Sequence, residues 1–415
     1  MKKKIGVIGS GISGIVSAFL LDKKYDVTLI EGDYRLGGHT NTISVDDQVL
    51  GSIGIDTGFI VFNLQNYPLF TKFLNQLDVS YQDSDMSFGL WDLQQKFWYS
   101  SDFPKGVFSD YKNIFSPTFW CFLKEIKSFN KKVLKDLECC AMGSLRLGEY
   151  LDIQVYTSFF KHSYLLPMGA AIWSCPTEHI LKFPAHSFFS FWKNHSLLTL
   201  GKRPVWKTVS KGSQTYISKF LNQFQGTVLK GSPVISIEET QDEVEVTLKN
   251  HRKFKFDYVV VATHADQALS LLKKPTDNQK KLLSSWQYSK NQVCLHTDIS
   301  VMPPKRSAWA SWLVQNSNDR NLVMTYYMNR LQKFHSPVDY FVTLNHFGSI
   351  SKDKIIKIIN YKHPVYDQRS LDSQKELPKL NKGPIFFCGS YFGYGFHEDG
   401  VKSAVDACQH LGVEL

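Results

Sequence analysis

The feature that most constrains this chain is a glycine-rich turn close to its start. The segment Val7-Ile-Gly9-Ser-Gly11-Ile-Ser-Gly14 joins a short apolar run over 4–8 to a stretch with helical spacing over 12–24, and a second apolar run follows over 27–30. This order predicts a strand–helix–strand unit. Glycines at such a turn let backbone amides at the helix N-terminus approach a pyrophosphate, and a side chain at Gly11 would block that approach.

An acidic residue after the second strand strengthens this interpretation. Glu31 follows Gly9 by 22 residues. A carboxylate at this place can accept hydrogen bonds from both hydroxyls of an adenosine ribose, and it disfavours a 2′-phosphate. The glycine pattern alone is weak, but with Glu31 it predicts that the first fifty residues hold the ADP half of a dinucleotide. The candidate binding residues of the turn are Gly9, Gly11, Ser13 and Gly14.

The string that follows Glu31 separates a flavin from a nicotinamide. It reads Glu31-Gly-Asp-Tyr-Arg35-Leu-Gly37-Gly38-His39-Thr40. Arg35 can neutralise phosphate charge, while Gly37 and Gly38 let the backbone pass close to the pyrophosphate and the ribityl chain. A surface turn with an unrelated arginine is the alternative. Because simple dehydrogenases have no use for this string, it favours non-covalent FAD, with His39 and Thr40 as further candidate binding residues.

Charge and cysteine usage limit the partners. Lys and Arg number 48 and Asp and Glu 38, so the net charge is +10, which suits an anionic ligand, a phospholipid surface or a nucleic acid. No RNA-binding or zinc-finger pattern is present, which disfavours nucleic acid. Seven cysteines without metal-ligand spacing indicate reduced thiols in a cytoplasmic protein with no metal site. The apolar stretch after Met1–Lys4 mimics a secretory signal, but its four glycines argue against one.

The chain is long enough for two domains. Beyond the first unit, alternation over 42–56 predicts a hairpin, and 67–77 has the pattern of a helix. An α/β pattern returns over 212–272, with a helix over 215–223 and strands over 234–238, 244–248 and 258–262. Further strands are expected over 321–328 and 339–345. We therefore expect an α/β fold: a Rossmann-type FAD-binding domain made of 1–60, 206–272 and 380–415, interwoven with a mixed α+β substrate-binding domain made of 61–205 and 273–379.

The stretch from Tyr81 to Trp206 differs from the rest of the chain, because it contains 26 of the 58 aromatic residues. Its poverty in strand signals predicts a mainly helical region, and its aromatic side chains suit a wide apolar tunnel for an acyl or isoprenoid substrate. Within it, 117–142 has the spacing of an amphipathic helix with lysines on its outer face. Such a helix can lie on the anionic inner membrane surface or pack against the protein's own core.

Three separated pieces carry a resemblance to a known family. Gly9 to Thr40, Pro233-Val234 with Val259-Val-Val-Ala262, and Phe386-Phe-Cys-Gly389 to Ala404 resemble the cofactor motifs of the flavin-containing amine oxidase superfamily, which includes monoamine oxidases, protoporphyrinogen oxidases and phytoene desaturases. The resemblance implies a backbone contact from Val234 to adenine. It also implies that Gly389 and Ser390 lie by the ribityl and pyrophosphate region, although many relatives have an acid where this chain has Ser390.

The same resemblance places the start of the last helix beside the flavin. Glu398, Asp399 and Gly400 begin that helix, whose positive N-terminal end would face the flavin N1 and C2 carbonyl. His397 precedes them and is the candidate catalytic residue, as a proton-transfer or substrate-orienting group; a purely structural role next to the helix cap is the alternative. Cys175 and Cys388 have apolar surroundings in the sequence, which predicts buried, inert thiols.

A closer resemblance concerns a bacterial subgroup of predicted NAD/FAD-binding proteins. It rests on the segments 56–63, 84–88, 167–174 and 393–400. Members of that subgroup are often encoded beside fatty-acid cyclopropane synthases, which implies a role in lipid metabolism. We therefore expect an FAD-dependent oxidoreductase that exchanges hydride between flavin N5 and a hydrophobic lipid or acyl-chain substrate. The alternatives are a flavin-dependent oxidase of a small amine and a non-catalytic flavin-binding accessory protein for a lipid-modifying enzyme.

Overall fold

The computed structural model describes residues 2–173, 176–199, 204–316, 322–345, 348 and 350–415. Its central element is a parallel sheet in the order β10-β2-β1-β14-β20. The strands are β1 (Lys4–Ile8), β2 (Asp26–Ile30), β10 (Thr227–Leu229), β14 (Tyr258–Val261) and β20 (Ile385–Phe387). Segments from the beginning, the middle and the end of the chain thus meet in one sheet, which we call the nucleotide sheet.

Helices cover the nucleotide sheet, which explains why its strands are apolar on both faces. Helix α1 (Ile12–Leu21) follows β1 and packs against α14 (His397–Gln409), the last helix of the chain. Helix α9 (Gln214–Gln223) and a small antiparallel sheet of β11 (Val234–Glu239), β12 (Val244–Leu248) and β13 (Lys253–Phe256) complete this part. The strands and helices predicted here are confirmed, although the first helix ends three residues before the predicted Lys24.

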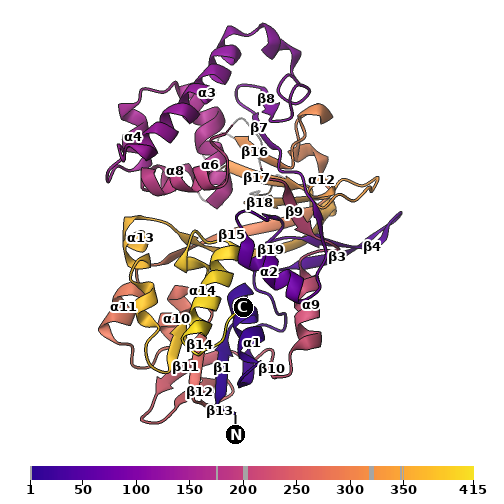
Figure 1. The fold of residues 1–415 in the computed structure, drawn as a ribbon. Helices are drawn as coiled ribbons and strands as arrows, with labels where there is room; N and C mark the ends of the chain where they lie inside the picture. Colours follow the sequence, from indigo (N-terminus) through magenta and orange to yellow (C-terminus); the bar gives the residue numbers. More distant parts are fainter. Residues whose placement is uncertain (1, 174–175, 200–203, 317–321, 346–347, 349) are drawn as a thin grey trace.

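A second, larger sheet lies above the nucleotide sheet in the view of Figure 1. Its order is β19-β15-β18-β17-β16-β7-β8, and all pairs are antiparallel except β16 with β7. The strands are β7 (Phe88–Asp92), β8 (Phe97–Ser100), β15 (Gln287–His296), β16 (Trp312–Asn316), β17 (Leu322–Tyr327), β18 (Phe341–Leu344) and β19 (Ile355–Val365). The predicted strands over 321–328 and 339–345 correspond to β17 and β18, with residue 321 outside the described residues.

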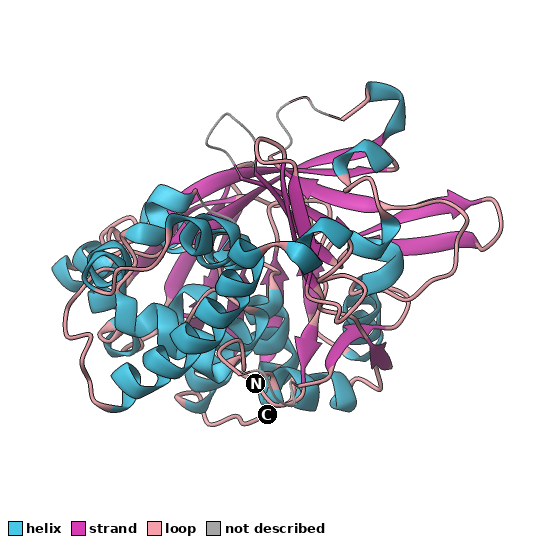
Figure 2. Cartoon of the chain, turned by 90° about the horizontal axis from the view of Figure 1, so that it is seen from above, coloured by secondary structure: helices cyan, strands magenta, loops and turns pink. Residues whose placement is uncertain are grey.

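Shorter elements connect these parts. The predicted hairpin is confirmed as β3 (Thr42–Asp47) and β4 (Gly51–Asp56), which project from one side of the molecule (Figures 1 and 2). The predicted helix over 67–77 is α2 (Pro68–Gln76). The remaining connections contain a small sheet and four short helices, namely β5 (Phe62–Asn63), β9 (Trp206–Val209), β6 (Tyr81–Asp83), α10 (Ala265–Leu271), α11 (Asp277–Leu283), α12 (Met328–Leu331) and α13 (Gln368–Gln374).

The aromatic-rich stretch is helical only in its later part. Helices α3 (Pro117–Glu138), α4 (Leu147–Ile153), α5 (Ser158–Phe160), α6 (Leu166–Trp173), α7 (Thr177–Leu181) and α8 (Ala185–Asn194) gather at the end of the molecule away from the nucleotide sheet (Figure 1). The expectation of few strands is wrong for residues 81–100, which form β6, β7 and β8. These strands depend on partners far along the chain, since β7 pairs with β16 and β6 with β9, and local patterns do not reveal such pairing.

Helix α3 settles how the amphipathic segment packs. Its apolar face is buried, and Phe129 contacts Phe160, Phe189 and Trp192. Its five central lysines, Lys124, Lys127, Lys131, Lys132 and Lys135, are exposed. The apolar face therefore belongs to the protein's own core and is not available to a membrane. Among the described residues, no helix is long and apolar enough to cross a bilayer.

Candidate functional site

The glycine turn between β1 and α1 is tight on one side and open on the other. Gly9 has a φ of +95°, and a Cβ placed on Gly14 would lie 1.9 Å from the Gly9 carbonyl oxygen, so both positions require glycine. A Cβ on Gly11, by contrast, would meet no other atom within 4 Å. Gly11 is the N-cap of α1. Open space at this helix end, where amides are unpaired, fits a phosphate group.

Glu31 is held in place by the same turn. Its Oε2 accepts hydrogen bonds from the Ser10 amide at 2.8 Å and the Ser10 hydroxyl at 2.6 Å, and its Oε1 accepts one from the Asp33 amide at 2.9 Å. The side chain is partly exposed. A carboxylate with two oxygens can accept further bonds, so a ribose fits beside it. Sequence reasoning missed Ser10, although its place between two glycines of the motif could have indicated it.

Arg35 organises the following loop from within. Its guanidinium donates to the carbonyl oxygens of Thr40 at 2.8 Å, Gly38 at 2.7 Å and Leu36 at 3.2 Å. Gly37 and Gly38 both have positive φ, and a Cβ on Gly38 would lie 3.2 Å from the Gly11 Cα. The loop therefore lies in contact with the glycine turn between β1 and α1. The role expected for Arg35, neutralisation of phosphate charge, stays a prediction, because its donors bind backbone carbonyls here.

Thr40 and His397 lie together in a polar contact. The Thr40 hydroxyl is 3.1 Å from Nε2 of His397 and also contacts the Tyr216 hydroxyl, which is 3.4 Å from the same nitrogen. Phe59 stacks on the imidazole with 3.6 Å between ring centroids. Burial lowers the pKa of His397 well below its usual value. The ring is thus a neutral, packed group whose Nε2 already has protein partners, and a catalytic role stays a prediction.

The acidic residues at the start of α14 bind protein amides. Glu398 accepts from the amides of Leu69 at 3.0 Å and Phe70 at 2.9 Å, which are the first free donors of α2. Asp399 accepts from the Phe396 amide at 2.9 Å, and burial raises the pKa of Asp399 to about 6. Glu398 therefore connects α14 to α2, while Asp399 caps the N-terminus of its own helix. Because these carboxylates are already bound, a neighbouring group would meet the backbone amides at the N-terminus of α14 rather than the two acidic side chains.

The remaining predicted positions approach the same edge of the nucleotide sheet. Gly389 follows β20, and its amide donates to the Ser403 hydroxyl at 2.9 Å, while the Ser390 carbonyl accepts from the amides of Gly393 and Gly395. Val234 begins β11 next to Glu31, since a Cβ on Gly32 would lie 3.6 Å from the Pro233 Cα. The carboxyl ends of β1, β2 and β20 thus lead directly into predicted site residues. Ligands bind at this edge in open parallel sheets.

Three histidines form a cluster beside this edge that sequence reasoning did not bring together. His39 stacks on Tyr361 at 4.9 Å between ring centroids and lies 5.2 Å from His363 and 6.3 Å from His264. Burial lowers the pKa of His39 and His264 to about 4 and that of His363 to about 3, so all three rings are neutral at pH 7. No local pattern connects them, because they come from three distant segments.

Two atoms of this cluster point to a bound molecule. His39 Nε2 and His264 Nδ1 are buried and have no hydrogen-bond partner among the described residues. Buried polar atoms are normally paired. His39 directly follows the loop that touches the Gly11 turn, so a flavin that lies along this edge fits both the open cradle and the unpaired nitrogens.

Comparison with known proteins agrees with this geometry. The family described as flavin containing amine oxidoreductase matches residues 12–320, which is most of the chain. The chain belongs to this family. It is accordingly an oxidoreductase of the amine oxidase type that uses a flavin. None of the curated proteins is a significant match.

Solved structures of similar fold include amine oxidases and a lipid enzyme. A redesigned putrescine oxidase aligns with a TM-score of 0.71 and 12% identity over 99% of both chains. Cyclohexylamine oxidase from Brevibacterium oxydans IH-35A gives a TM-score of 0.69 and 13% identity over 99% of this chain and 100% of its own. A CLA-producing fatty acid isomerase from P. acnes gives 0.68 and 11% over 98% of both. At these identities the likeness concerns the fold.

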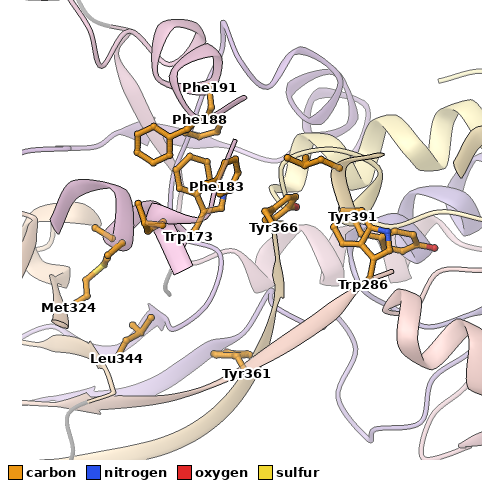
Figure 3. Packing of buried hydrophobic residues seen from close by; sticks show 14 of the residues in the cluster. Trp173, Phe183, Phe188, Phe191, Trp286, Met324, Leu344, Tyr361, Tyr366 and Tyr391 are labelled. Atoms are coloured by element: carbon orange, nitrogen blue, oxygen red, sulfur yellow. The ribbon is translucent and has the colours of Figure 1, made fainter. Parts of the chain in front are cut away.

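Aromatic side chains connect the C-terminal motif of this amine oxidase-type fold to its helical end. Tyr391 lies 5.7 Å from Trp286, Trp286 lies 5.5 Å from Tyr366, and Tyr366 lies 5.8 Å from Phe183. Phe183 in turn contacts Trp173 of α6 at 4.8 Å. We call these five residues, Tyr391, Trp286, Tyr366, Phe183 and Trp173, the aromatic row, and Figure 3 shows them. All five side chains are buried, and so are many aromatic residues in the core of the helical end, among them Phe122, Phe129, Phe160, Phe189 and Trp192.

Among the described residues, the thiols and possible metal ligands form no second site. Cys388 is buried next to Ser17, and burial raises the pKa of its thiol to about 12, in agreement with an inert cysteine. Cys175 lies outside the described residues. Within the described ranges, no group of three or more His, Cys, Asp or Glu side chains could hold a metal ion.

Proposed function

We propose that this protein binds FAD non-covalently and transfers hydride between its flavin and a long apolar substrate, a lipid or another acyl chain. The observation that carries the substrate class is the aromatic row, because it runs from the C-terminal cofactor motif at Tyr391 to Trp173 in the helical end. Each buried methylene of a chain contributes about 0.8 kcal/mol to binding. An extended apolar wall is therefore what a long chain needs.

Specific groups would hold FAD. Backbone amides at Gly11 and the start of α1 would bind the pyrophosphate, Glu31 the ribose, and the backbone of Val234 the adenine. The N-terminal end of α14 and the unpaired Nε2 of His39 would face the ring system. When bound, the flavin supplies a hydride acceptor or donor at N5. The side chains around it orient the substrate and exclude water.

The ionisable groups near the C-terminal motif favour an uncharged substrate. Glu398 and Asp399 both bind backbone amides, and the histidines of the cluster are neutral. A cationic amine therefore has no free carboxylate from this motif to pair with. The similar fold of a fatty acid isomerase supports an acyl substrate. A small amine is the second candidate, which the similar putrescine and cyclohexylamine oxidases favour.

Acid precipitation tests the cofactor. Purified protein should be yellow, and the supernatant after precipitation should contain all of the flavin as FAD, without FMN. Flavin that stays with the pellet would show covalent attachment. Colourless protein that binds only NAD in a titration would refute the cofactor assignment.

Anaerobic titration tests the substrate. Oxidised protein, and protein reduced with dithionite, are mixed with phospholipids that bear saturated, unsaturated or cyclopropane acyl chains, and separately with a panel of amines. We expect lipids to bleach or restore the flavin absorbance and amines to leave it unchanged. Bleaching by amines alone, without lipid binding, would refute the lipid assignment. Lipid binding without any redox change would instead favour the accessory role.

A pair of variants links this result to the aromatic row. Phe183→Leu removes the ring that contacts both Trp173 and Tyr366 in the aromatic row. Phe129→Leu makes the same change within the core of the helical end. Both should retain flavin. Only Phe183→Leu should slow the lipid-dependent change of the flavin at a given lipid concentration, and equal effects of both variants would contradict the role of the row.

A further inference from the structure

Five large apolar side chains within residues 103–120 are exposed at the helical end of the molecule. Phe103 is 79% exposed, Tyr111 60%, Ile114 44%, Phe115 81% and Trp120 44%. They come from the loop after β8, the short 3-10 helix Tyr111–Phe115 and the first turns of α3. We call these five residues the aromatic tip.

Contacts through Phe108 and the Trp120 indole connect three members of the aromatic tip, namely Phe103, Ile114 and Trp120. Phe103 lies 6.2 Å from Phe108 between ring centroids, and Phe108 lies 5.6 Å from Trp120. The Trp120 indole donates to the Ile114 carbonyl at 2.8 Å. Phe108 also contacts the buried Phe119 at 6.1 Å, which connects the tip to the core. Tyr111 and Phe115 lie in the same short helix as Ile114, so all five exposed side chains belong to one supported segment. Exposed apolar side chains grouped in this way mark an interaction surface, unlike isolated ones.

Positive charge surrounds the aromatic tip. Lys105, Lys112, Lys124 and Lys127 are exposed, and none of them forms an ion pair within the described part of the chain. Lys305 lies over the Tyr111 ring, 5.2 Å from its centroid. The surface around the tip therefore offers free cations beside apolar rings.

The acidic residues of the same segment are already engaged. Asp102 pairs with Arg330 at 2.7 Å, Asp110 accepts from the Lys112 amide at 3.1 Å, and Glu125 accepts from the Thr157 amide at 2.8 Å. Asp110 and Glu125 bind neutral amides and keep their negative charge, whereas Arg330 compensates Asp102. The four free lysines outnumber these two uncompensated acids, so the segment presents a net positive charge to an approaching anionic surface.

We propose that the aromatic tip docks this protein on an anionic phospholipid bilayer. Aromatic side chains favour the interface between headgroups and acyl chains, and each nearby lysine adds attraction to anionic lipids. An open cavity of about 350 Å³, whose wall includes Phe103 and Lys105, gives a headgroup room next to the tip. The complementary charge selects a bilayer over a neutral apolar partner. The proposal does not depend on the substrate of the flavin site.

Vesicle sedimentation with the flavin-loaded protein tests this docking. Vesicles of phosphatidylcholine alone are compared with vesicles that also contain phosphatidylglycerol. We expect binding to the anionic vesicles and weaker binding at high salt, since salt screens exposed charges. The double variant Phe103→Ser/Phe115→Ser should bind at least about tenfold more weakly, because two rings no longer enter the interface. The affinity of Lys112→Glu/Lys124→Glu for anionic vesicles should fall by about tenfold or more, and its affinity for phosphatidylcholine vesicles should stay unchanged.

Matched controls separate docking from general effects. Val49→Ser removes an apolar side chain that is 66% exposed on the β3–β4 turn, and Lys357→Glu reverses an exposed charge on β19. Both should bind vesicles like the unaltered protein, and all variants should keep their flavin absorbance. Failure to bind phosphatidylglycerol vesicles, or binding that the tip variants leave unchanged, would overturn the proposal. If the unaltered protein is a dimer and Phe103→Ser/Phe115→Ser is a monomer, the aromatic tip mediates self-association, and the docking proposal is overturned.

Discussion

His397 Nε2 lies 3.1 Å from the Thr40 hydroxyl oxygen, although 357 positions separate the two residues in the chain. Thr40 ends the loop that Arg35 organises, and His397 begins α14. The contact therefore joins the first and the last of the three cofactor motifs. Tyr216, from α9, completes it through its hydroxyl. This arrangement supports the alternative expected for His397, a structural role that does not require proton transfer, and the first prediction tests it against catalysis.

The first prediction separates the two roles of His397. His397→Phe keeps a ring that can stack on Phe59 but removes the hydrogen bonds of Nε2. We expect the free energy of unfolding to fall by about 1–3 kcal/mol, the usual cost of removing a hydrogen-bond partner from buried polar groups, because the Thr40 and Tyr216 hydroxyls keep only each other as partners. Flavin content should fall with it. Urea unfolding and flavin absorbance measure both effects. His186→Phe, on the exposed side of α8, is the control.

A purely catalytic histidine would give another pattern. The variant would then keep its stability and its flavin and lose only the rate of flavin reduction by substrate. His397→Gln adds a second comparison, because its amide can still bond to Thr40 or Tyr216. If His397 has a positioning role, His397→Gln should be more stable than His397→Phe. If His397 transfers a proton, His397→Gln should reduce its flavin as slowly as His397→Phe.

The second prediction concerns the open side of the glycine turn. Gly11 has a φ of −64°, so other residues can adopt its backbone conformation, and a Cβ there meets no protein atom within 4 Å. Gly11→Ala and Gly11→Val should therefore fold but bind flavin progressively less well, since the side chain fills the space beside the helix amides. Gly148→Ala, where the new Cβ would lie 3.4 Å from the Leu181 carbonyl oxygen, should keep full occupancy. Full flavin occupancy in Gly11→Val would mean that the nucleotide lies elsewhere.

The third prediction tests Glu31. Glu31→Ala removes the carboxylate that accepts from Ser10 and would accept from the ribose. We expect flavin affinity to fall by about 1–3 kcal/mol, less severely than in Gly11→Val. Ser10→Ala is the informative companion, because it loosens Glu31 without removing the carboxylate. Titration of flavin-depleted protein with FAD measures the change, and unchanged affinity in Glu31→Ala would contradict the assignment.

The sequence allowed prediction where the information is local. Patterns within a few residues predict the strands and helix around Gly9 and the hairpin at 42–56. The spacing between Gly9 and Glu31 predicts that the carboxylate lies beside the glycine turn. Ser10 was missed because its role depends on a carboxylate 21 residues away. The strands β7 and β8 were missed because β7 is completed by β16, more than two hundred residues later.

The histidine cluster lies further beyond the reach of sequence patterns. His39 was selected for its place after Gly38, but His264 and His363 have no motif, and only the packing of three segments brings the rings together. The function expected for Arg35 was assigned to its side chain, whereas in the structure the guanidinium binds backbone carbonyls of its own loop. Residue type and spacing predict such contacts poorly because the direction of a side chain depends on its neighbours.

The fourth prediction is a loss of stability in mild acid. The pKa of His39, His264 and His363 is lowered to about 4, 4 and 3 in the folded protein, against 6.5 in an unfolded chain. Between pH 6.5 and 4 the unfolded chain therefore binds protons that the folded protein does not, and stability falls as the pH falls. Each proton that differs changes the free energy of unfolding by about 1.4 kcal/mol per pH unit.

Two buried acids act in the opposite direction. Burial raises the pKa of Asp56 and Asp399 to about 6, so the folded protein binds their protons first as the pH falls toward 4. Burial also lowers the pKa of His195 and His397 and raises that of Glu398 and Asp406. Five histidines thus outnumber four acids, and a net loss of stability is expected from pH 6.5 to 4.5. Urea unfolding across this range measures the slope. His363→Asn should flatten it and Asp56→Asn should steepen it, and slopes that do not respond to either variant would contradict this account.

The fifth prediction concerns the contact between the first and last helices of the fold. A Cβ placed on Gly400 would lie 2.7 Å from Ile12 Cγ2 and 3.0 Å from the Ser13 hydroxyl oxygen. The first distance is too short for real packing, so α14 would have to move away from α1. The gain in helix propensity from Gly to Ala, about 1 kcal/mol, opposes this effect. Overpacking of a tight contact costs typically about 1–3 kcal/mol, and we expect Gly400→Ala to be destabilised on balance.

A double-variant cycle shows whether this contact is the cause. Ile12→Ala removes the Cγ2 atom that the new methyl group would meet, so Gly400→Ala should cost less in the Ile12→Ala background than in the unaltered protein. If α14 presents its N-terminal end to the flavin, its displacement should also lower flavin occupancy in Gly400→Ala, and the double variant should recover part of it. Equal costs in both backgrounds would place the effect of Gly400 elsewhere than in its contact with α1. Recovery of stability without recovery of flavin would separate the packing of α14 from its proposed role at the cofactor.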